Sequence, residues 1–181
     1  MSENKALDQL QQDVLAEIAG IRDFPEGAYN IRVNGASAGR QSTPTVSITP
    51  KTDKPGIDVT VQAGAKKQML HIPVVLSNDD LQEVVYNDFY IGEGAEVTIV
   101  AGCGIHNCGS GRSQHDGVHS FYLEKDAQVR YLEKHTGSGE LNSERVLNPV
   151  TNCYLKEGSH MEMDTQQIRG VTSTKRVTRG Q

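Results

Sequence analysis

Two cysteines and three histidines are gathered in one short stretch of the sequence, residues 103–119. The set comprises Cys103, His106, Cys108, His115 and His119. Thiolate and imidazole are ligands that suit zinc, ferrous iron and iron–sulfur clusters. Glycines within the stretch allow the backbone to turn these side chains toward a common point. The pattern therefore predicts a soft-metal or sulfur site, with Cys103, His106, Cys108 and His115 as metal ligands and His119 as a further contact to the bound group.

The spacing of these residues leaves other interpretations open. The frame C-x2-H-x-C-x6-H-x3-H matches no standard zinc finger, and a glycine-rich segment with scattered histidines can be a solvated turn. We expect the segment to be a loop between two strands, in which Arg112 favours the thiolate form of a nearby cysteine. A zinc-dependent enzyme that uses the same loop with an open coordination position is a further alternative.

Composition and charge exclude several classes of partner. The net charge is -5 and no basic stripe follows the chain, so nucleic acid is not an expected partner. No apolar run approaches the length of a membrane span. We therefore expect a cytoplasmic protein with no membrane partner. Its three cysteines are predicted to be free thiols or metal ligands, because an odd number cannot all pair.

The elements that would position the site change in character along the chain. Apolar residues spaced by three and four predict a helix over residues 6–21, and the stretch 27–44, rich in glycine and serine, indicates a connecting loop. From Thr45 onward, short runs of alternating apolar and polar residues are typical of β-strands. The expected division is an amino-terminal helix and loop in residues 1–44 and a β core in residues 45–181.

The β core contains an internal repeat with a period of 32 residues: segments 90–99, 122–131 and 154–163 align position for position. The turn residues Gly94, Asp126 and Gly158 tolerate positive φ, and each is followed by a small residue. The inward positions after the turns are Val97 and Ile99, Val129 and Tyr131, and Met161 and Met163. A repeat that cannot bury its apolar side alone must stack on its neighbours, so the pattern predicts a solenoid. Three hairpins of an ordinary β-sandwich are the alternative.

The repeat also predicts the environment of the third cysteine. Cys153 occupies the place that Phe89 and Phe121 hold in the other copies. We therefore expect an inward position, where a free cysteine acts as a small hydrophobic residue.

Several segments resemble, in this order, the compact SufB/SufD-type proteins of archaea and anaerobic bacteria, a family of iron–sulfur cluster assembly scaffolds. The resemblance is carried by residues 27–32, 39–42, 71–74, 103–107, 113–117 and 131–135. The resemblance extends over most of the chain and is spread over several segments, without one diagnostic motif. It implies a mainly β fold, a right-handed parallel β-helix with an amino-terminal α-helix. It also implies a scaffold, not an enzyme, with ATPase activity in a partner subunit.

The resemblance further implies roles for residues and partners. Cys103 would accept sulfur, and the cargo would be a transient iron–sulfur cluster, or iron. Partners would be a SufC-type ATPase subunit, a sulfur donor, and a second copy or a paralogous scaffold. The carboxyl-terminal end of the family's β-helix would lie beyond residue 181, so we expect it to be missing here. The alternative is a non-catalytic solenoid module that pairs with a full-length scaffold or an ATPase subunit.

Overall fold

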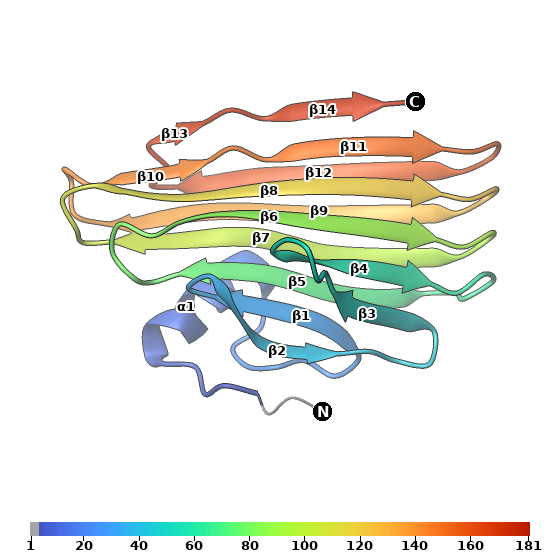
Figure 1. Cartoon of the computed structure of the whole chain (residues 1–181), viewed down its shortest axis with the longest axis horizontal. Coiled ribbons are helices and arrows are strands. Elements are labelled where there is room, and N and C mark those ends of the chain that lie inside the picture. Colours follow the sequence, from blue (N-terminus) through green and yellow to red (C-terminus); the bar gives the residue numbers. More distant parts are fainter. Residues whose placement is uncertain (1–3) are drawn as a thin grey trace.

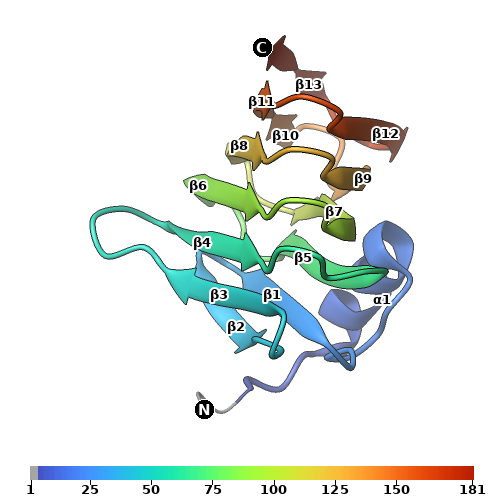
Figure 2. The same cartoon turned by 90° about the vertical axis from the view of Figure 1, so that its right-hand side faces the viewer.

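The strands of this protein stack in two sheets that face one another across a narrow core (Figures 1 and 2). The computed structural model describes residues 4–181, so residues 1–3 of the expected amino-terminal segment lie outside it. Sheet A contains, in spatial order, β12 (His160–Arg169), β9 (Gln128–Gly139), β7 (Glu96–Asn107), β5 (Gln68–Leu76), β1 (Ala28–Val33) and β2 (Ala36–Gln41). Sheet B contains β13 (Ser173–Thr174), β10 (Glu144–Leu147), β8 (Arg112–Leu123), β6 (Gln82–Ile91), β4 (Gly56–Val61) and β3 (Val46–Pro50). Two further strands extend sheet B, β11 (Val150–Leu155) beside β8 and β14 (Val177–Gly180) beside β11.

Neighbouring strands in the stack run parallel and come from successive coils. Phe89 on β6 pairs with Phe121 on β8, which pairs with Cys153 on β11. In sheet A, β5, β7, β9 and β12 are parallel in the same way. Within residues 4–181, the antiparallel pairs are β1–β2 in sheet A and β3–β4 in sheet B. A sandwich of hairpins would give antiparallel neighbours throughout. The predicted parallel β-helix is therefore confirmed, and the sandwich alternative is wrong.

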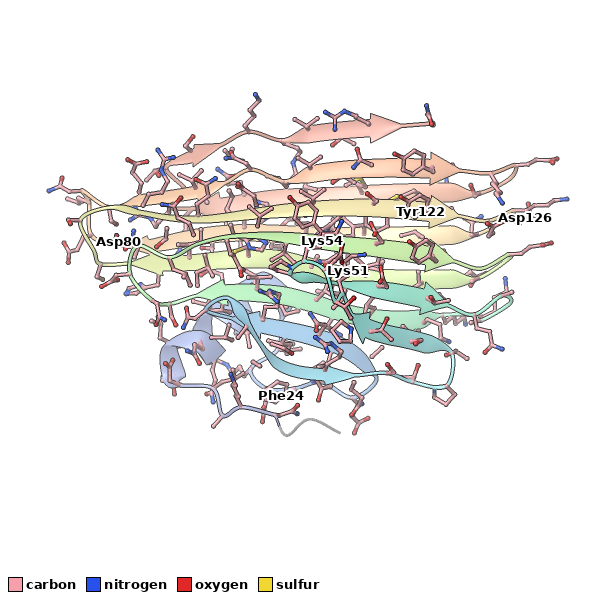
Figure 3. The ribbon with its side chains drawn as sticks, in the orientation of Figure 1. Phe24, Lys51, Lys54, Asp80, Tyr122 and Asp126 are labelled. Carbon is pink, nitrogen blue, oxygen red and sulfur yellow. The ribbon has the colours of Figure 1, made fainter. Side chains whose placement is uncertain are left out.

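The turns of the repeat stack as regularly as its strands. Gly94, Asp126 and Gly158 have φ values of 64°, 59° and 70°. The N–H of Gly94 donates to the carbonyl of Lys125, and that of Asp126 donates to the carbonyl of Glu157, at 2.9 and 3.0 Å. Asp126 marks this end of the solenoid in Figure 3. The prediction that these residues adopt positive φ is confirmed.

The period of two along each strand separates an inner from an outer face. Phe89 and Phe121 are fully buried and stack with ring centroids 4.5 Å apart, and Cys153 continues their row with 8% of its surface exposed. One residue further along, Tyr90, Tyr122 and Tyr154 form an outer ladder with centroids 5.1 and 5.0 Å apart. The predicted inward place of Cys153 and the equivalence of the three copies are confirmed. The inward positions after the turns also join the core.

The helix α1 (Gln9–Ala19) covers part of the outer face of sheet A, against β5, β7 and β9 (Figure 2). Its start is fixed by Asp8, whose carboxylate accepts the N–H of Gln11 while the Gln11 side chain accepts the N–H of Asp8. Leu15 and Ile18 are buried against residues of β1 and β5. The predicted helix is confirmed, although it is shorter at both ends than residues 6–21. Among residues 4–181, no helix is long and apolar enough to cross a membrane.

Two segments predicted to be loops are strands. Residues 28–33 and 36–41 form the hairpin β1–β2, in which β1 is buried on both faces because α1 covers its outer side. Residues 103–119 lie almost entirely on β7 and β8, joined by a short turn. Both predictions were wrong for one reason: these strands lack the alternation of apolar and polar residues that marks a half-buried strand.

Candidate functional site

Partway along the coils, the inward-facing side chains change from apolar to polar. The polar members are Cys103 on β7, Glu133 and His135 on β9, His115 and His119 on β8, and Asn87 on β6. Together with apolar neighbours such as Ile72, Val74 and Leu147, these six side chains line a cavity of about 20 Å³ between the two sheets. A cavity of this size holds about one water-sized particle. The cavity is therefore a small, polar chamber inside an otherwise apolar core.

The thiol of Cys103 lies inside this chamber and is nearly inaccessible to solvent. Only 1% of the residue is exposed, and its partner across the β7–β9 pair is His135. Burial raises the pKa of Cys103 well above its usual value, and the negative charges of Glu83 and Glu133 raise it further. The thiol is therefore protonated at neutral pH, and it needs a base before it can act as a nucleophile.

His119 belongs to a chain of hydrogen bonds across the core. Its Nδ1 lies 2.9 Å from the hydroxyl of Tyr131, and its Nε2 lies 3.3 Å from Nδ2 of Asn87. Both contacts are satisfied when Nδ1–H donates to Tyr131 and Nε2 accepts from the Asn87 amide. Burial is the main cause that lowers the pKa of His119 to about 4. The imidazole is therefore neutral at neutral pH.

Glu133 is the charged centre of the same chain. Its carboxylate accepts the Tyr131 hydroxyl at 2.6 Å and a guanidinium N–H of Arg176 at 2.5 Å, and it lies 3.3 Å from Nε2 of His135. Burial alone would raise the pKa of Glu133, but His135, Arg176 and Tyr131 together lower it. Burial lowers the pKa of His135, against the opposing charge of Glu133. The pair therefore consists of a carboxylate and an imidazole that favours its neutral form.

A second charged group supports the chamber from the side of sheet B. His115 Nδ1 lies 2.9 Å from one carboxylate oxygen of Glu83, and Arg32 donates to the other oxygen at 2.9 Å. A Cβ atom at Gly117 would lie 3.4 Å from Nε2 of His115 and 3.2 Å from Nε2 of His119. The glycine therefore leaves open the space that these two nitrogen atoms border.

The structure does not bring the five predicted residues to one point. Cys103, His115 and His119 share the chamber, whereas His106 and Cys108 lie at the surface, with Cys108 Sγ 3.2 Å from His106 Nε2. Within residues 4–181, no group of three or more His, Cys, Asp or Glu side chains is arranged to hold a metal ion. The expectation of a single converging site is therefore corrected to two separate groups.

The predicted influence of Arg112 on a cysteine is not what the structure shows. Its guanidinium pairs with Glu144 at 2.8 Å on the surface of the solenoid. Cys103 is enclosed in the core, where the pKa of its thiol is raised rather than lowered. The expectation assumed a loop, whereas Cys103 lies on β7 and Arg112 begins β8.

Several residues in or beside the chamber were not among the predicted site residues. They are Glu83, Asn87, Tyr131, Glu133 and His135. The period of 32 residues contained a signal for most of them. Residue 135 follows residue 103 by one period, and Glu83 and Asn87 precede His115 and His119 by the same interval, as the strand register confirms.

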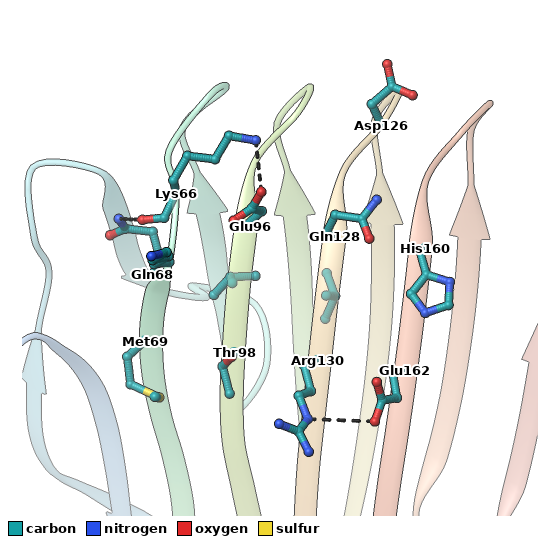
Figure 4. Close-up of a pocket in the computed structure, with 13 residues that line it drawn as sticks. Lys66, Gln68, Met69, Glu96, Thr98, Asp126, Gln128, Arg130, His160 and Glu162 are labelled. Atoms are coloured by element: carbon teal, nitrogen blue, oxygen red, sulfur yellow. Dashed lines mark hydrogen bonds and ion pairs between the residues drawn. The ribbon is translucent and has the colours of Figure 1, made fainter.

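A larger cavity is a groove elsewhere, on the outer face of sheet A (Figure 4). It measures about 750 Å³ and crosses β5, β7, β9 and β12. Four of its charged side chains form two ion pairs, Lys66 with Glu96 at 3.1 Å and Arg130 with Glu162 at 3.7 Å. Lys67 and Asp126 also line the groove, so its basic and acidic side chains are equal in number, and no reactive groups converge there. The small chamber is the stronger candidate despite its size.

One short motif has the spacing of a hydrolase nucleophile, Gly-x-Ser-x-Gly, over residues 35–39. Ser37 lies on β2 and pairs with Arg32 of β1 in an antiparallel hairpin. The nucleophile elbow requires a sharp turn from a strand into a helix. The hairpin does not provide that turn, so the motif carries no catalytic assignment.

No protein-family model, curated protein or solved structure matches this chain. The chemistry of the site therefore follows from its own geometry. A protonated thiol, the neutral imidazole of His119 and the carboxylate of Glu133 border a space large enough for one small particle. This set can take up a single soft atom and move a proton within the core.

Proposed function

We propose that this protein is a scaffold component of the SUF-type iron–sulfur cluster assembly system, in which Cys103 accepts sulfur. One observation carries the proposal: the Cys103 thiol faces the same enclosed chamber as the imidazoles of His119 and His135. The resemblance of several segments to SufB/SufD-type scaffolds and the parallel β-helix are consistent with it. We further propose a SufC-type ATPase subunit, a sulfur donor and a second scaffold chain as partners.

The proposed step is the transfer of one sulfane sulfur atom from a persulfide donor. The Cys103 thiol gives its proton to a neutral imidazole, for which His135 is placed opposite it on β9. The thiolate attacks the terminal sulfur, a new S–S bond forms, and the donor leaves as a thiolate that takes up a proton. The products are a Cys103 persulfide and a donor thiol.

The size of the chamber limits what can be held there. About 20 Å³ accommodates one added sulfur atom, but it does not fit a cluster of several iron and sulfur atoms. Because Cys103 is only 1% exposed, the donor persulfide can reach it only if the coils around it open. Cluster formation requires the same opening, or movement of the sulfur to the rim. ATP hydrolysis by the proposed partner would supply free energy for such an opening. Iron and sulfide are cargo in this scheme.

Anaerobic reconstitution with iron and sulfide tests the proposal. The absorption spectrum, the bound iron and the acid-labile sulfide are compared between the natural protein and Cys103→Ser. Cys153→Ser is the matched control, because Cys153 is also an inward, buried thiol but lies in the apolar cluster beside Met161. We expect loss of bound sulfide in Cys103→Ser alone. Equal sulfide in both variants would remove Cys103 from the site, and tightly held zinc without sulfide would favour a zinc enzyme.

A second candidate is a non-catalytic module that pairs with a full-length scaffold or with the ATPase. It is favoured by the outer side of β12, on which no other strand pairs within residues 4–181 and where most residues are exposed. An edge of this kind presents free backbone N–H and C=O groups to another chain. Size measurement of the protein alone and with the ATPase subunit separates the candidates. A protein that stays monomeric and does not bind the ATPase subunit would exclude the interaction module.

A further inference from the structure

A second group of reactive side chains lies at the opposite end of the solenoid from Asp126. Here β7 ends and the chain turns into β8; the turn is held by Asp80, whose carboxylate accepts the N–H of Gly111 at 2.9 Å (Figure 3). Cys108 begins this turn and is exposed. Its side chain is therefore accessible to molecules in solution, unlike those of the two other cysteines.

The Cys108 thiol is one member of a hydrogen-bonded series of three side chains. Its Sγ lies 3.2 Å from Nε2 of His106, and Nδ1 of the same ring lies 2.8 Å from Oγ of Ser138. Ser138 is held opposite His106 by the parallel pairing of β7 and β9. Both contacts are satisfied when Nδ1–H donates to Ser138 and Nε2 accepts from the thiol. A nucleophile, a base and a third group that orients the base is the arrangement that activates a thiol.

The surroundings of Cys108 differ from those of the two other thiols. Its backbone N–H donates to the carboxylate of Asp79 at 2.7 Å, which fixes the turn but places a negative charge nearby. The base in contact with the thiol is the imidazole of His106, 3.2 Å from Sγ. Burial raises the pKa of Cys103 and of Cys153, and both side chains are enclosed. Among the three thiols, only that of Cys108 has both access to solvent and a base in contact.

We propose that Cys108 and His106, with Ser138 as a positioning residue, form a surface site for thiol–disulfide exchange with low-molecular-weight disulfides. Nε2 of His106 takes the thiol proton, and Sγ of Cys108 attacks one sulfur of the disulfide. The Cys108 S–S bond forms as the disulfide bond breaks, and the leaving thiolate takes the proton back from the imidazole. The products are a mixed disulfide on Cys108 and one free thiol, with no other oxidant or reductant needed.

The experiment follows the reaction of the full chain with bis(2-hydroxyethyl) disulfide, a neutral probe that Asp79 does not repel. Intact-protein mass spectrometry gives the rate of adduct formation at neutral pH, and peptide mapping gives its position. We expect Cys108 to react first and His106→Asn to slow the reaction by about 10-fold or more, since positioned bases contribute about 10²–10⁴-fold. Cys153→Ser is the control and should react at the natural rate.

Ser138 is tested by loss and by rescue. Ser138→Ala removes the hydroxyl that orients the imidazole and should slow the reaction, whereas Ser138→Thr keeps a hydroxyl and should restore the rate. A merely structural role would not distinguish these two variants in this way. Equal rates for His106→Asn and the natural protein, or a first adduct on Cys103 or Cys153, would overturn the proposal. Equal slowing by both Ser138 variants would remove Ser138 from it.

Discussion

Replacing Glu133 with glutamine removes the negative charge that joins Tyr131, Arg176 and His135 in the buried network of the chamber. The carboxylate is 5% exposed and contacts the Tyr131 hydroxyl, the Arg176 guanidinium and the His135 imidazole. Glutamine has nearly the same shape, so the packing of β9 against the core is preserved. The variant therefore isolates the contribution of charge from that of volume.

The size of the effect follows from the exposure of the partners. Breaking a buried ion pair by removing one member costs about 3–5 kcal/mol, because the other charge is left uncompensated. The Arg176 side chain is 32% exposed and can recover part of its hydration, which places the expected loss at the lower end, about 3 kcal/mol. For a chain of this length, that corresponds to a fall in melting temperature of about 6–12 °C.

Urea unfolding of the natural protein and the variant measures this loss. The matched control is Glu124→Gln, which makes the same chemical change at an exposed ion pair with Lys156, 2.7 Å away. The Glu124 side chain is 49% exposed, so we expect a loss of no more than about 1 kcal/mol there. Equal losses for Glu133→Gln and Glu124→Gln would refute the view that the buried network stabilises the chamber.

The difference in stability between the natural protein and Glu133→Gln should depend on pH. The pKa of Glu133 in the folded protein is below its usual value of 4.5, despite the opposing effect of burial. A carboxyl group with a lowered folded pKa stabilises the protein above the pKa of the unfolded chain, and this contribution is lost as the pH falls through the folded pKa. The difference between the natural protein and Glu133→Gln should therefore be full above pH 4.5 and shrink in more acidic solution. A difference that grows on acidification would contradict the assignment of a charged Glu133.

Two further outcomes are expected. Burial lowers the pKa of the His119 imidazole to about 4, so this ring should stay neutral in an NMR titration from neutral pH down to about pH 5. An ordinary histidine is protonated at pH 5. A titration midpoint at the usual value of 6.5 would mean that water reaches the ring. Gly102→Ala should cost about 3 kcal/mol or more in thermal unfolding, because a Cβ there would lie 2.2 Å from the carbonyl oxygen of Lys134. Gly94→Asp should cost no more than about 1 kcal/mol, since Asp126 has the same role one coil later, and equal costs for the two glycine variants would be inconsistent with this account.

The solenoid could be predicted from the sequence because its repeat has a physical basis. Residues one period apart occupy the same place in successive coils, so Phe89, Phe121 and Cys153 must all satisfy the same inward environment. The turns impose a matching demand on φ at Gly94 and Asp126. These requirements recur every 32 residues, and such a repeat can be detected in one sequence without comparison to others.

The strands around the chamber could not be predicted in the same way. On β8, the inward positions hold Ser113, His115, Gly117 and His119, which are polar or small where a half-buried strand would show apolar residues. On β1, both faces are buried because α1 packs on the outer one, so no alternation arises. Periodicity reports the polarity of the environment, and it fails where a polar group or a second covering layer changes that environment.

The arrangement of the chamber shows where reactive residues should be sought in such a fold. A motif read along the chain joined Cys103 to His106 and Cys108. However, His106 is three positions from Cys103 on β7 and so points to the opposite face, and Cys108 lies in the turn beyond the strand. Reading across the coils instead joins Cys103 to His135, which the register places side by side. The same reading joins His106 to Ser138 at the surface. In this solenoid, residues one period apart are paired neighbours on adjacent strands. The residues of the site are therefore found by the period of the repeat and not by the spacing of the cysteines along the chain.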